Sequence, residues 1–315
     1  MHVIMTGATS FIGKAVTKEF LEAGCQVTAV VRPDSPGREQ LEREGKVRVI
    51  PCSLDRIKEL ENIGISEKLG NTRAADAWLH LGWEGAGSAN RQNPELQAKN
   101  IGYAMDALRT AARLGCSRFL FCGSQAEYGI CRGPMREDME CHPVSEYGKD
   151  KLKVCEEASA EGKRLGISYI HARVFSVYGP GDHPWSLVST CVDTFLKGGH
   201  MELGPCTQMW NFLYIKDAAR ALAKLLLAKV PAGVYNVAGE DTRPLRNYIE
   251  ELYGLCGSRG SYEFGNRPPN AEGVVSLIPD LTRLRDTVGF RQEISFEEGI
   301  LEMIQGLKKE RKTDS

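Results

Sequence analysis

A tyrosine and a lysine stand four residues apart in the segment SEYGKDK, at the start of an expected helix over 145–165. Residues at this spacing lie on one face of a helix, so Tyr147 and Lys151 point the same way. A phenol has a pKa near 10 and is a poor acid/base at neutral pH, but a cation about 4 Å away lowers that pKa. The spacing therefore suits a general acid/base, although Tyr-x-x-x-Lys alone is common on surface helices.

Two further segments bring chemistry to the same place. Ser124 closes the apolar run RFLFCG, and its hydroxyl can hydrogen-bond the substrate oxygen whose proton Tyr147 handles. The opening TGATSFIG places Gly7 and Gly13 between an expected strand and helix, where a helix N-terminus favours a diphosphate. Ser10 occupies the position where such turns usually have a second glycine, and we expect its hydroxyl to donate to a phosphate oxygen.

The residue that ends the second expected strand (25–31) indicates which dinucleotide binds. NAD sites usually have an acidic residue there for the ribose 2′-hydroxyl, whereas an arginine suits a 2′-phosphate. This chain has Arg32, with Ser35 and Arg38 nearby. We therefore expect NADP to be preferred, with NAD as the alternative.

The elements that must position these residues alternate between strand and helix along the first half of the chain. Apolar strands are expected at 2–7, 25–31, 47–50, 77–82, 118–123 and 168–174, with helices at 11–23, before Leu114 and at 145–165. Strands apolar on both faces indicate an α/β fold with a doubly wound parallel sheet, the Rossmann arrangement, which binds ligands at the carboxyl ends of its strands. A helix at 217–229 and a strand at 233–239 are expected to return to this sheet.

These elements suggest two domains. We expect a dinucleotide-binding domain over 1–174, rejoined by 208–240, and a smaller mixed α/β substrate-binding domain formed by 175–207 and 241–315.

Composition excludes several other classes of protein. The 315 residues have a formal net charge of −1, which gives no reason to expect nucleic-acid or membrane-surface binding. The ten cysteines show no Cys-x-x-Cys pair and no histidine at zinc spacing, so we expect reduced, mostly buried thiols and no metal site. With no apolar run long enough to cross a bilayer, we expect a soluble cytoplasmic protein.

Over nearly its whole length the chain resembles the extended short-chain dehydrogenases/reductases, in the group of nucleotide-sugar epimerases, dehydratases and ketoreductases. The segments that carry the resemblance are TGATSFIG, HLG (80–82), Asn100, GSQAEYG (123–129), Tyr147 with Lys151, RVFSVYGPGD (173–182), FLYIKDAARA (212–221), YNVAG (235–239) and PDLTRLRDTVGF (279–290). The resemblance implies a catalytic triad of Ser124, Tyr147 and Lys151. It also implies a cofactor site formed by Gly7, Thr9, Ser10, Phe11, Ile12, Gly13, Arg32, Ser53, Leu81, Gly82, Asn100 and Lys151.

Departures from the family pattern narrow the chemistry. Dehydratases of the group usually have acidic residues after the catalytic hydroxyl, whereas this chain has Gln125 and Ala126, and Glu127 one step further can point elsewhere. Arg32 favours a one-way NADPH-dependent 4-ketoreductase acting on a nucleotide-linked sugar, with Tyr147 as the acid/base. A NAD-dependent 4-epimerase is the alternative, and a dehydratase or a non-catalytic NADP-binding regulator is disfavoured.

The substrate side gives a mixed picture. Ser176 stands where the family often has asparagine, and Trp210 stands where an arginine usually grips the diphosphate. Arg267 does match a second phosphate-binding arginine of the family. We expect the substrate site to be formed by Trp83, Glu84, Gln125, Ser176, Trp210 and Arg267. The family often dimerises through two long helices, here 91–114 and 145–165, so a homodimer is expected.

Overall fold

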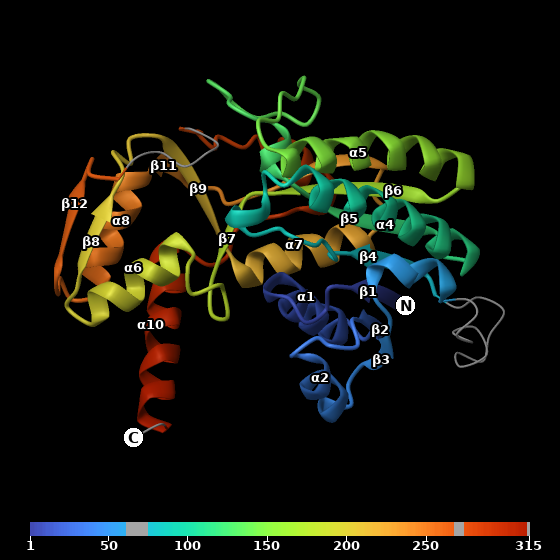
Figure 1. Ribbon diagram of the computed structural model, residues 1–315, viewed down its shortest axis with the longest axis horizontal. Coiled ribbons are helices and arrows are strands. Elements are labelled where there is room, and N and C mark those ends of the chain that lie inside the picture. Colours follow the sequence, from blue (N-terminus) through green and yellow to red (C-terminus); the bar gives the residue numbers. More distant parts are fainter. Residues whose placement is uncertain (61–74, 268–273, 314–315) are drawn as a thin grey trace.

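A seven-stranded parallel sheet forms the centre of the molecule in the computed structural model, which describes residues 1–60, 75–267 and 274–313 (Figure 1). Its strand order is β10-β6-β5-β4-β1-β2-β3, so the order reverses between β1 and β4. The strands are β1 (His2–Thr6), β2 (Gln26–Val31), β3 (Arg48–Pro51), β4 (Ala77–His80), β5 (Arg118–Ser124), β6 (Ser168–Val174) and β10 (Gly233–Val237). Every pairing between neighbours is parallel, which confirms the predicted doubly wound α/β fold.

The strands are apolar on both faces because helices cover both sides of the sheet. In β1, Val3 and Met5 join the hydrophobic core on one side, and Ile4 joins the core on the other. Successive side chains of a strand point to opposite faces, so a continuous apolar run serves both layers.

Helices lie on both sides of the sheet (Figure 1). One side carries α1 (Phe11–Glu22) and α7 (Ile215–Leu227), which contact each other. The other carries α4 (Pro94–Arg113) and α5 (Glu146–Leu165), which also lie side by side. The shorter elements of this part are α2 (Arg38–Glu44), the 3-10 turns η1 (Leu54–Glu59), η2 (Ser88–Asn90) and η3 (Gln125–Glu127), and α9 (Thr282–Val288).

Local signals set the ends of the helices that matter for the site. The Ser145 side chain accepts a hydrogen bond from the backbone N–H of Gly148 at the start of α5, and Gly166 ends the helix in the left-handed conformation. A serine at the first position and a left-handed glycine at the end satisfy backbone groups that the helix leaves unpaired. The start of α5, and with it Tyr147, is therefore fixed by the sequence.

The remaining elements form a second region beside the carboxyl ends of the strands (Figure 1). They are β7 (Ser176–Tyr178), α6 (Leu187–Leu196), β8 (His200–Leu203), β9 (Met209–Tyr214), β11 (Thr242–Pro244), α8 (Leu245–Leu255), β12 (Ser261–Phe264) and α10 (Phe296–Thr313). The strands form a three-stranded sheet, β11-β9-β7, and a two-stranded sheet, β12-β8. The core of this region is rich in buried aromatic residues, among them Tyr178, Phe195, Tyr248 and Phe296.

The helices and strands predicted from the sequence are present in the structure, with somewhat different boundaries. The strand expected at 233–239 is β10, which pairs with β6 at the edge of the large sheet. The segment 208–240, which we expected to rejoin the large sheet, does so through α7 and β10, whereas β9 belongs to the three-stranded sheet. The division of the chain into two domains at the expected residues stays a prediction.

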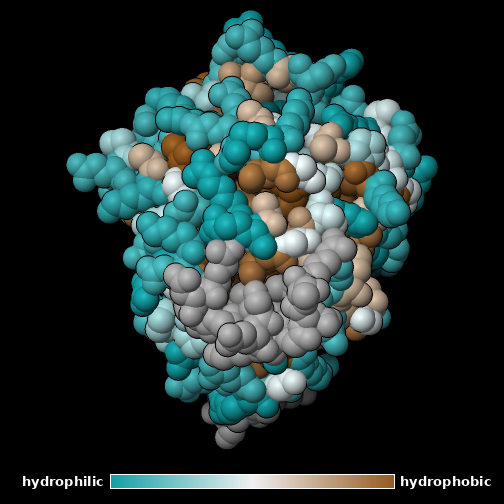
Figure 2. All heavy atoms as spheres, turned by 90° about the vertical axis from the view of Figure 1, so that its right-hand side faces the viewer, coloured by the Kyte–Doolittle hydropathy of each residue, from teal (hydrophilic) through white to brown (hydrophobic). Residues whose placement is uncertain are grey.

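Three surface and side-chain features bear on the expectations above. The end of the molecule at the right of Figure 1 is mostly hydrophilic in Figure 2, with a small group of hydrophobic residues near the centre of that view. Among the described residues, no helix is both long enough and apolar enough to span a bilayer. All ten cysteines are free thiols, seven of them buried.

Candidate active site

The turn between β1 and α1 has the shape that a bound diphosphate requires. Gly7 adopts a φ of +76°, and a side-chain carbon there would lie 3.0 Å from Leu81. A side-chain carbon at Gly13 would lie only 2.0 Å from the carbonyl oxygen of Gly7, so the helix can rest on the turn only with glycine there. The N-terminus of α1 thus opens toward the carboxyl ends of the strands, where its dipole favours an anion.

The Ser10 side chain is engaged within this turn. Its hydroxyl donates to the Gly7 carbonyl oxygen (2.7 Å) and accepts from the Gly13 N–H (3.1 Å), so it acts as the N-cap of α1. We expected its proton to reach a phosphate oxygen, but the structure directs that proton to Gly7. Ser10 therefore stabilises the turn that would hold the phosphate, and this local role explains how a serine replaces the middle glycine.

A groove of ≈ 680 Å³ runs from this turn along the carboxyl edge of the sheet. Gly7, Thr9 and Ser10 line it together with Leu81 and Gly82, as expected of cofactor-binding residues. A side-chain carbon at Gly82 would lie 2.8 Å from the Leu54 side chain, so glycine keeps this wall open. Two other expected residues lie to the side: Phe11 lines a neighbouring cavity, and Ser53 immediately precedes the η1 turn.

The end of the groove nearest β2 has a basic lining. Arg32 and Ser35 both line it, and the Ser35 hydroxyl is 3.0 Å from the Thr9 hydroxyl. Arg38, which follows Arg32 closely in the sequence, lies 3.5 Å from Glu42 in an ion pair along α2. The groove can therefore offer a guanidinium and a hydroxyl to a negatively charged group on the ribose.

The loop after β4 is held in place from behind. The buried Asn100 side chain accepts from the Glu84 N–H (2.7 Å) and donates to the Glu84 carbonyl (3.0 Å). The Trp83 indole N–H donates to the Gln97 side chain (2.8 Å). Asn100 thus lies behind the loop that lines the groove, so its side chain positions Glu84 rather than facing the groove. His80 beneath this loop is buried and hydrogen-bonded to Thr6, and burial lowers its pKa to about 3, so it serves as a neutral packing residue.

Ser124 ends β5 at the same edge and is almost fully buried. Its hydroxyl oxygen accepts from the Ala126 N–H (3.2 Å), while its own N–H donates to the Glu127 carboxylate (2.7 Å). The two hydrogen bonds form a capping box around the η3 turn. Glu127 is fully buried and is not among the described residues that line the cavity beside Ser124.

Tyr147 lies in the first turn of α5 and, together with Ser124, lines a cavity of ≈ 350 Å³. Burial raises the pKa of Tyr147 to about 12, and a hydrogen bond with the Ser124 side chain opposes that shift. The cation that lowers the pKa is Arg91, whose guanidinium lies over the Tyr147 ring, 4.7 Å from its centroid.

The Lys151 ammonium contacts a backbone carbonyl and several aromatic rings. Its ammonium donates to the Cys122 carbonyl (2.7 Å) and lies over the Trp83 and Phe121 rings, at 3.9 and 4.5 Å from their centroids. Burial lowers the pKa of Lys151 to about 8. The same ammonium lies 5.6 Å from the centroid of the Tyr147 ring, so Arg91 and Lys151 both lie near that ring, with Arg91 the closer of the two. That Lys151 lowers the pKa of the phenol stays a prediction.

The expected substrate residues divide into three groups. Gln125, Ser176 and Trp210 line the same cavity as Ser124 and Tyr147. Trp83 and Glu84 instead line the groove, with the Trp83 ring edge-on to Tyr147 at 5.9 Å. Arg267 is exposed beside β8, where its N–H donates to the Leu203 carbonyl (3.2 Å), and it is not among the described residues that line the cavity.

Sequence reasoning missed two features of this site. Arg91 lies in the polar segment before α4, which carries no motif, so no signal in the chain marked it. The Trp210 indole N–H is buried without a hydrogen-bond partner among the described residues, and it lines the cavity. The sequence showed the tryptophan but could not show that its donor is unused.

Comparison with known proteins places this geometry in a family. The model of the NAD dependent epimerase/dehydratase family matches residues 3–238. The chain belongs to this family. Its members are NAD-dependent epimerases, dehydratases and reductases of the extended short-chain dehydrogenase/reductase type, and the chain is an enzyme of that type.

Relatives within the epimerase/dehydratase family are distant but match from end to end. The chain is 24% identical over 318 residues to a UDP-N-acetyl-alpha-D-glucosaminuronate decarboxylase of Bacillus cytotoxicus, covering 96% of each protein. It is 22% identical over 316 residues to a dTDP-4-dehydro-6-deoxyglucose reductase of Escherichia coli, covering 97% of each.

Solved structures of the family share the fold. A UDP-glucose 4-epimerase of Thermotoga maritima, solved with UDP-glucose, superimposes with a TM-score of 0.85 at 21% identity, covering 99% of this chain and 100% of that one. A UDP-glucuronic acid 4-epimerase of Bacillus cereus, solved with UDP-glucuronic acid and NAD, gives a TM-score of 0.80 at 20% identity, covering 98% and 100%. At these identities the likeness establishes the fold of this chain and leaves its substrate open.

Proposed function

We propose that the protein is an NADPH-dependent ketoreductase that reduces the 4-keto group of a nucleotide-linked sugar. The observation that carries this proposal is the cavity in which Tyr147 faces Ser124 with Gln125 beside them. Dehydratases of this group usually have an acidic residue after the catalytic hydroxyl, and the side chain that lines the cavity at that position here is a neutral amide. Reduction needs only a proton donor and a hydrogen bond to the carbonyl oxygen, and the cavity contains both.

The chain's own groups complete a balanced reaction. When bound, the nicotinamide supplies a hydride to the carbonyl carbon. Tyr147 donates its phenolic proton to the carbonyl oxygen, which yields the alcohol, and the Ser124 hydroxyl donates a hydrogen bond to the same oxygen. Arg91 stabilises the phenolate that remains, because its guanidinium lies over the ring. Lys151 holds the Cys122 carbonyl and, by resemblance to the family, binds the nicotinamide ribose.

The basic end of the groove supports NADP over NAD. Arg32 and Ser35 line it where an acidic residue would hold the ribose hydroxyl of NAD, and a guanidinium forms strong paired hydrogen bonds with a phosphate. The groove residues fit such a cofactor, since the glycines at 7, 13 and 82 leave room where side chains would collide.

A nucleotide-linked sugar is supported by the names of the relatives and by the cavity. The reductase of Escherichia coli is named for a dTDP-linked 4-dehydro sugar, and the match covers nearly all of both chains. In the cavity, the unused Trp210 donor and the Ser176 hydroxyl suit the hydroxyl-rich surface of a sugar.

A 4-epimerase is the second candidate. It would use the same Tyr147 and Ser124, and the solved structures with the same fold include UDP-sugar 4-epimerases. An epimerase oxidises and then re-reduces its substrate with a single retained cofactor, so it shows no net consumption of NADPH.

One experiment separates these candidates. Mass spectrometry first identifies any dinucleotide retained by the purified protein, and NADPH oxidation is then followed with a panel of nucleotide-linked 4-ketosugars. Net oxidation of NADPH with formation of the sugar alcohol supports the reductase. Retained NAD together with interconversion of two nucleotide sugars, and no net oxidation, would replace it with the epimerase.

We also propose a cytoplasmic homodimer in which α4 and α5 of each copy pack together. These two helices lie side by side on one face of the sheet, as a four-helix bundle between two copies would require (Figure 1). Light scattering that gives the mass of one chain would contradict the dimer.

A further inference from the structure

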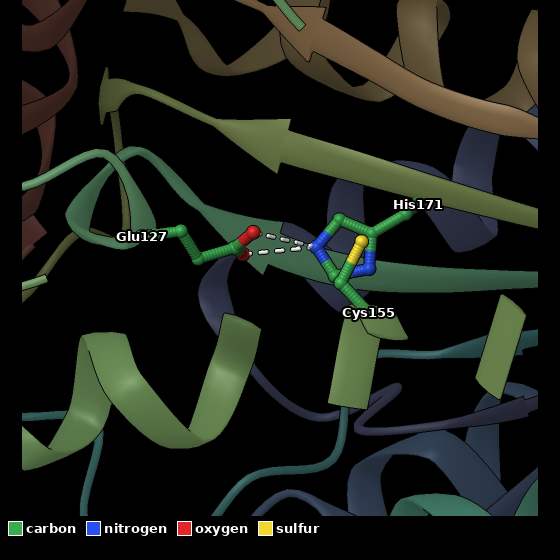
Figure 3. Close-up of side chains that lie close together, drawn as sticks. All are labelled: Glu127, Cys155 and His171. Atoms are coloured by element: carbon green, nitrogen blue, oxygen red, sulfur yellow. Dashed lines mark hydrogen bonds and ion pairs between the residues drawn. The ribbon is translucent and has the colours of Figure 1, made fainter. Parts of the chain in front are cut away.

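A cluster of buried charged side chains lies beneath Ser124 and outside the reaction cavity. In Figure 3 the Glu127 carboxylate points at the His171 ring, whose Nε2 is 2.9 and 3.0 Å from its two oxygens. The Arg173 Nε donates to the same carboxylate at 2.8 Å. Glu127 and His171 are fully buried, and Arg173 almost so. One carboxylate therefore faces two cationic side chains where water does not reach.

A hydrogen bond between Glu127 and the backbone connects this cluster to Ser124. The Ser124 N–H donates to Glu127 Oε1 at 2.7 Å. A hydrogen bond from a backbone N–H to an ionised carboxylate is roughly twice as strong as one between neutral groups. The Glu127 carboxylate thus fixes the residue whose hydroxyl faces Tyr147.

The neighbouring strands and helix leave space for the cluster and bring its side chains together. A side-chain carbon at Gly123 would lie 2.2 Å from His171 Nε2 and 2.6 Å from Glu127 Oε1, so this position of β5 requires glycine. His171 and Arg173 alternate along β6 and so face the same side of the sheet. On α5, Cys155 follows Lys151 by one turn and brings its sulfur to the same place (Figure 3).

Two interpretations of the cluster are possible, and its charges decide between them. The ligand atoms of Glu127, Cys155 and His171 lie within 4.8 Å of one another, which is close enough for a metal ion. However, a metal ligand must be deprotonated, and here Arg173 already neutralises the carboxylate while His171 Nε2 is hydrogen-bonded to it. Burial alone would raise the pKa of Glu127, but His171 and Arg173 lower it to about 2. Burial alone would lower the pKa of His171, but the Glu127 carboxylate raises it to about 9, as expected of an ion pair.

We propose that Glu127 is a positioning residue for the reduction: its carboxylate, held by His171 and Arg173, orients the catalytic Ser124 through the Ser124 N–H. This inference rests on the proposed function, since it assigns Ser124 the hydrogen bond to the substrate oxygen. His171 and Arg173 keep the carboxylate ionised and aimed at Ser124, and the Tyr169 hydroxyl is hydrogen-bonded to the far ring nitrogen of His171 (2.8 Å). Glu127 touches neither substrate nor cofactor in this role.

The test is a double-mutant cycle between Glu127→Gln and Ser124→Ala. Glutamine keeps the size of the side chain but offers a neutral acceptor, so kcat is expected to fall by about 10-fold. Because Glu127 acts through Ser124, the same change in the Ser124→Ala protein is expected to alter kcat by less than about 3-fold. The KM for NADPH is expected to stay unchanged in all variants.

A matched control is available on α5. Glu161 pairs with Arg109 and Arg164 away from the site, so Glu161→Gln also removes a paired carboxylate and is expected to leave kcat unchanged. An equal fall in kcat for Glu127→Gln with and without the Ser124 hydroxyl, or the same fall for Glu161→Gln, would overturn the proposal. Should Glu127→Gln fail to fold, His171→Gln takes its place in the cycle. It weakens the hold on the carboxylate and is expected to lower kcat by about 3-fold, only when Ser124 is present.

A second measurement does not depend on the substrate. Hydrogen exchange of the peptide covering 118–128 is compared between the wild type and the Glu127 variant, with the peptide covering β1 as the internal reference. We expect exchange to rise at least about 3-fold in the first peptide alone. If the wild type reduces no ketosugar, the proposed function fails, while unchanged exchange at 118–128 would separately remove the role of Glu127.

Discussion

The two sides of the reaction cavity are built in different ways. On the side of the large sheet, Ser124 and Lys151 each have fixed hydrogen-bond partners in neighbouring elements, at 2.7 Å in both cases. On the side of the three-stranded sheet, Ser176 and Trp210 face the cavity, and the Trp210 donor has no partner among the described residues. One side is preorganised, and the other leaves polar groups ready for a ligand.

This difference separates chemistry from specificity. Groups that act in the transition state gain from being held in place before the substrate arrives, because no reorganisation is then needed during the reaction. Groups that recognise the substrate must exchange their hydrogen bonds with it, so an unused donor is suited to that task. We expect substitutions on the large-sheet side to change kcat or cofactor choice, and substitutions on the other side to change KM for the sugar.

The largest effect is expected from Tyr147→Phe. The loss of the phenolic proton donor removes general acid catalysis, which typically contributes about 10²- to 10⁴-fold, so kcat for ketosugar reduction should fall by that factor. NADPH binding, measured by fluorescence titration, should be retained. Tyr103→Phe removes the hydroxyl of a partly buried tyrosine on α4 and should leave kcat unchanged. Full activity of the Tyr147 variant would show that the preorganised side does not carry the chemistry.

A second large effect is expected from Arg32→Asp. The change removes the guanidinium that lines the groove and places a carboxylate where the 2′-phosphate of NADP would bind. Charge-assisted hydrogen bonds of this kind contribute about 1.5–3 kcal/mol, so the Kd for NADPH should rise by about 10- to 100-fold, while NADH binds as well or better. Arg43→Asp, on the exposed surface of α2, is the matched control. A wild type that binds NADH more tightly than NADPH would exclude NADP preference.

Arg91→Gln tests the electrostatics of the preorganised side through pH. Arg91 lowers the pKa of Tyr147, so its removal raises that pKa further. Oxidation of the sugar alcohol by NADP⁺ needs the phenolate, so its rate at pH 8 should fall by at least about 10-fold and recover as the pH rises. The exposed Arg132→Gln variant should keep the wild-type profile. An unshifted profile for Arg91→Gln would mean that its charge does not act on Tyr147.

The same comparison explains which parts of the fold and of the candidate site could be predicted from the sequence. Strand-helix alternation, the glycine turn and the Tyr147–Lys151 spacing are local patterns, so they predicted the large sheet and the residues at its edge. The position of Arg91 beside the Tyr147 ring was not predicted, because spacing along a helix fixes a face but not every partner that a long, flexible side chain finds. Lys151 reaches a carbonyl of β5, whereas Arg91 arrives from a polar segment without a motif. The charged cluster of Glu127, His171 and Arg173 depends on pairing between β5 and β6, which the sequence does not show residue by residue.

The smallest effect, and the one that tests the substrate side, is expected from Trp210→Phe. Phenylalanine keeps an aromatic ring against Phe212 but removes the buried indole N–H that lacks a partner. If that donor binds a substrate oxygen in the ground state and the transition state alike, the loss of one neutral hydrogen bond should raise KM for the nucleotide sugar by about 3- to 10-fold and leave kcat unchanged. Trp185→Phe, on the exposed loop before α6, should change neither constant. A fall in kcat without a change in KM would show that Trp210, a residue of the three-stranded sheet, acts mainly in the transition state. The two sides of the cavity would then not differ in the way proposed here, because both would contribute catalytic groups.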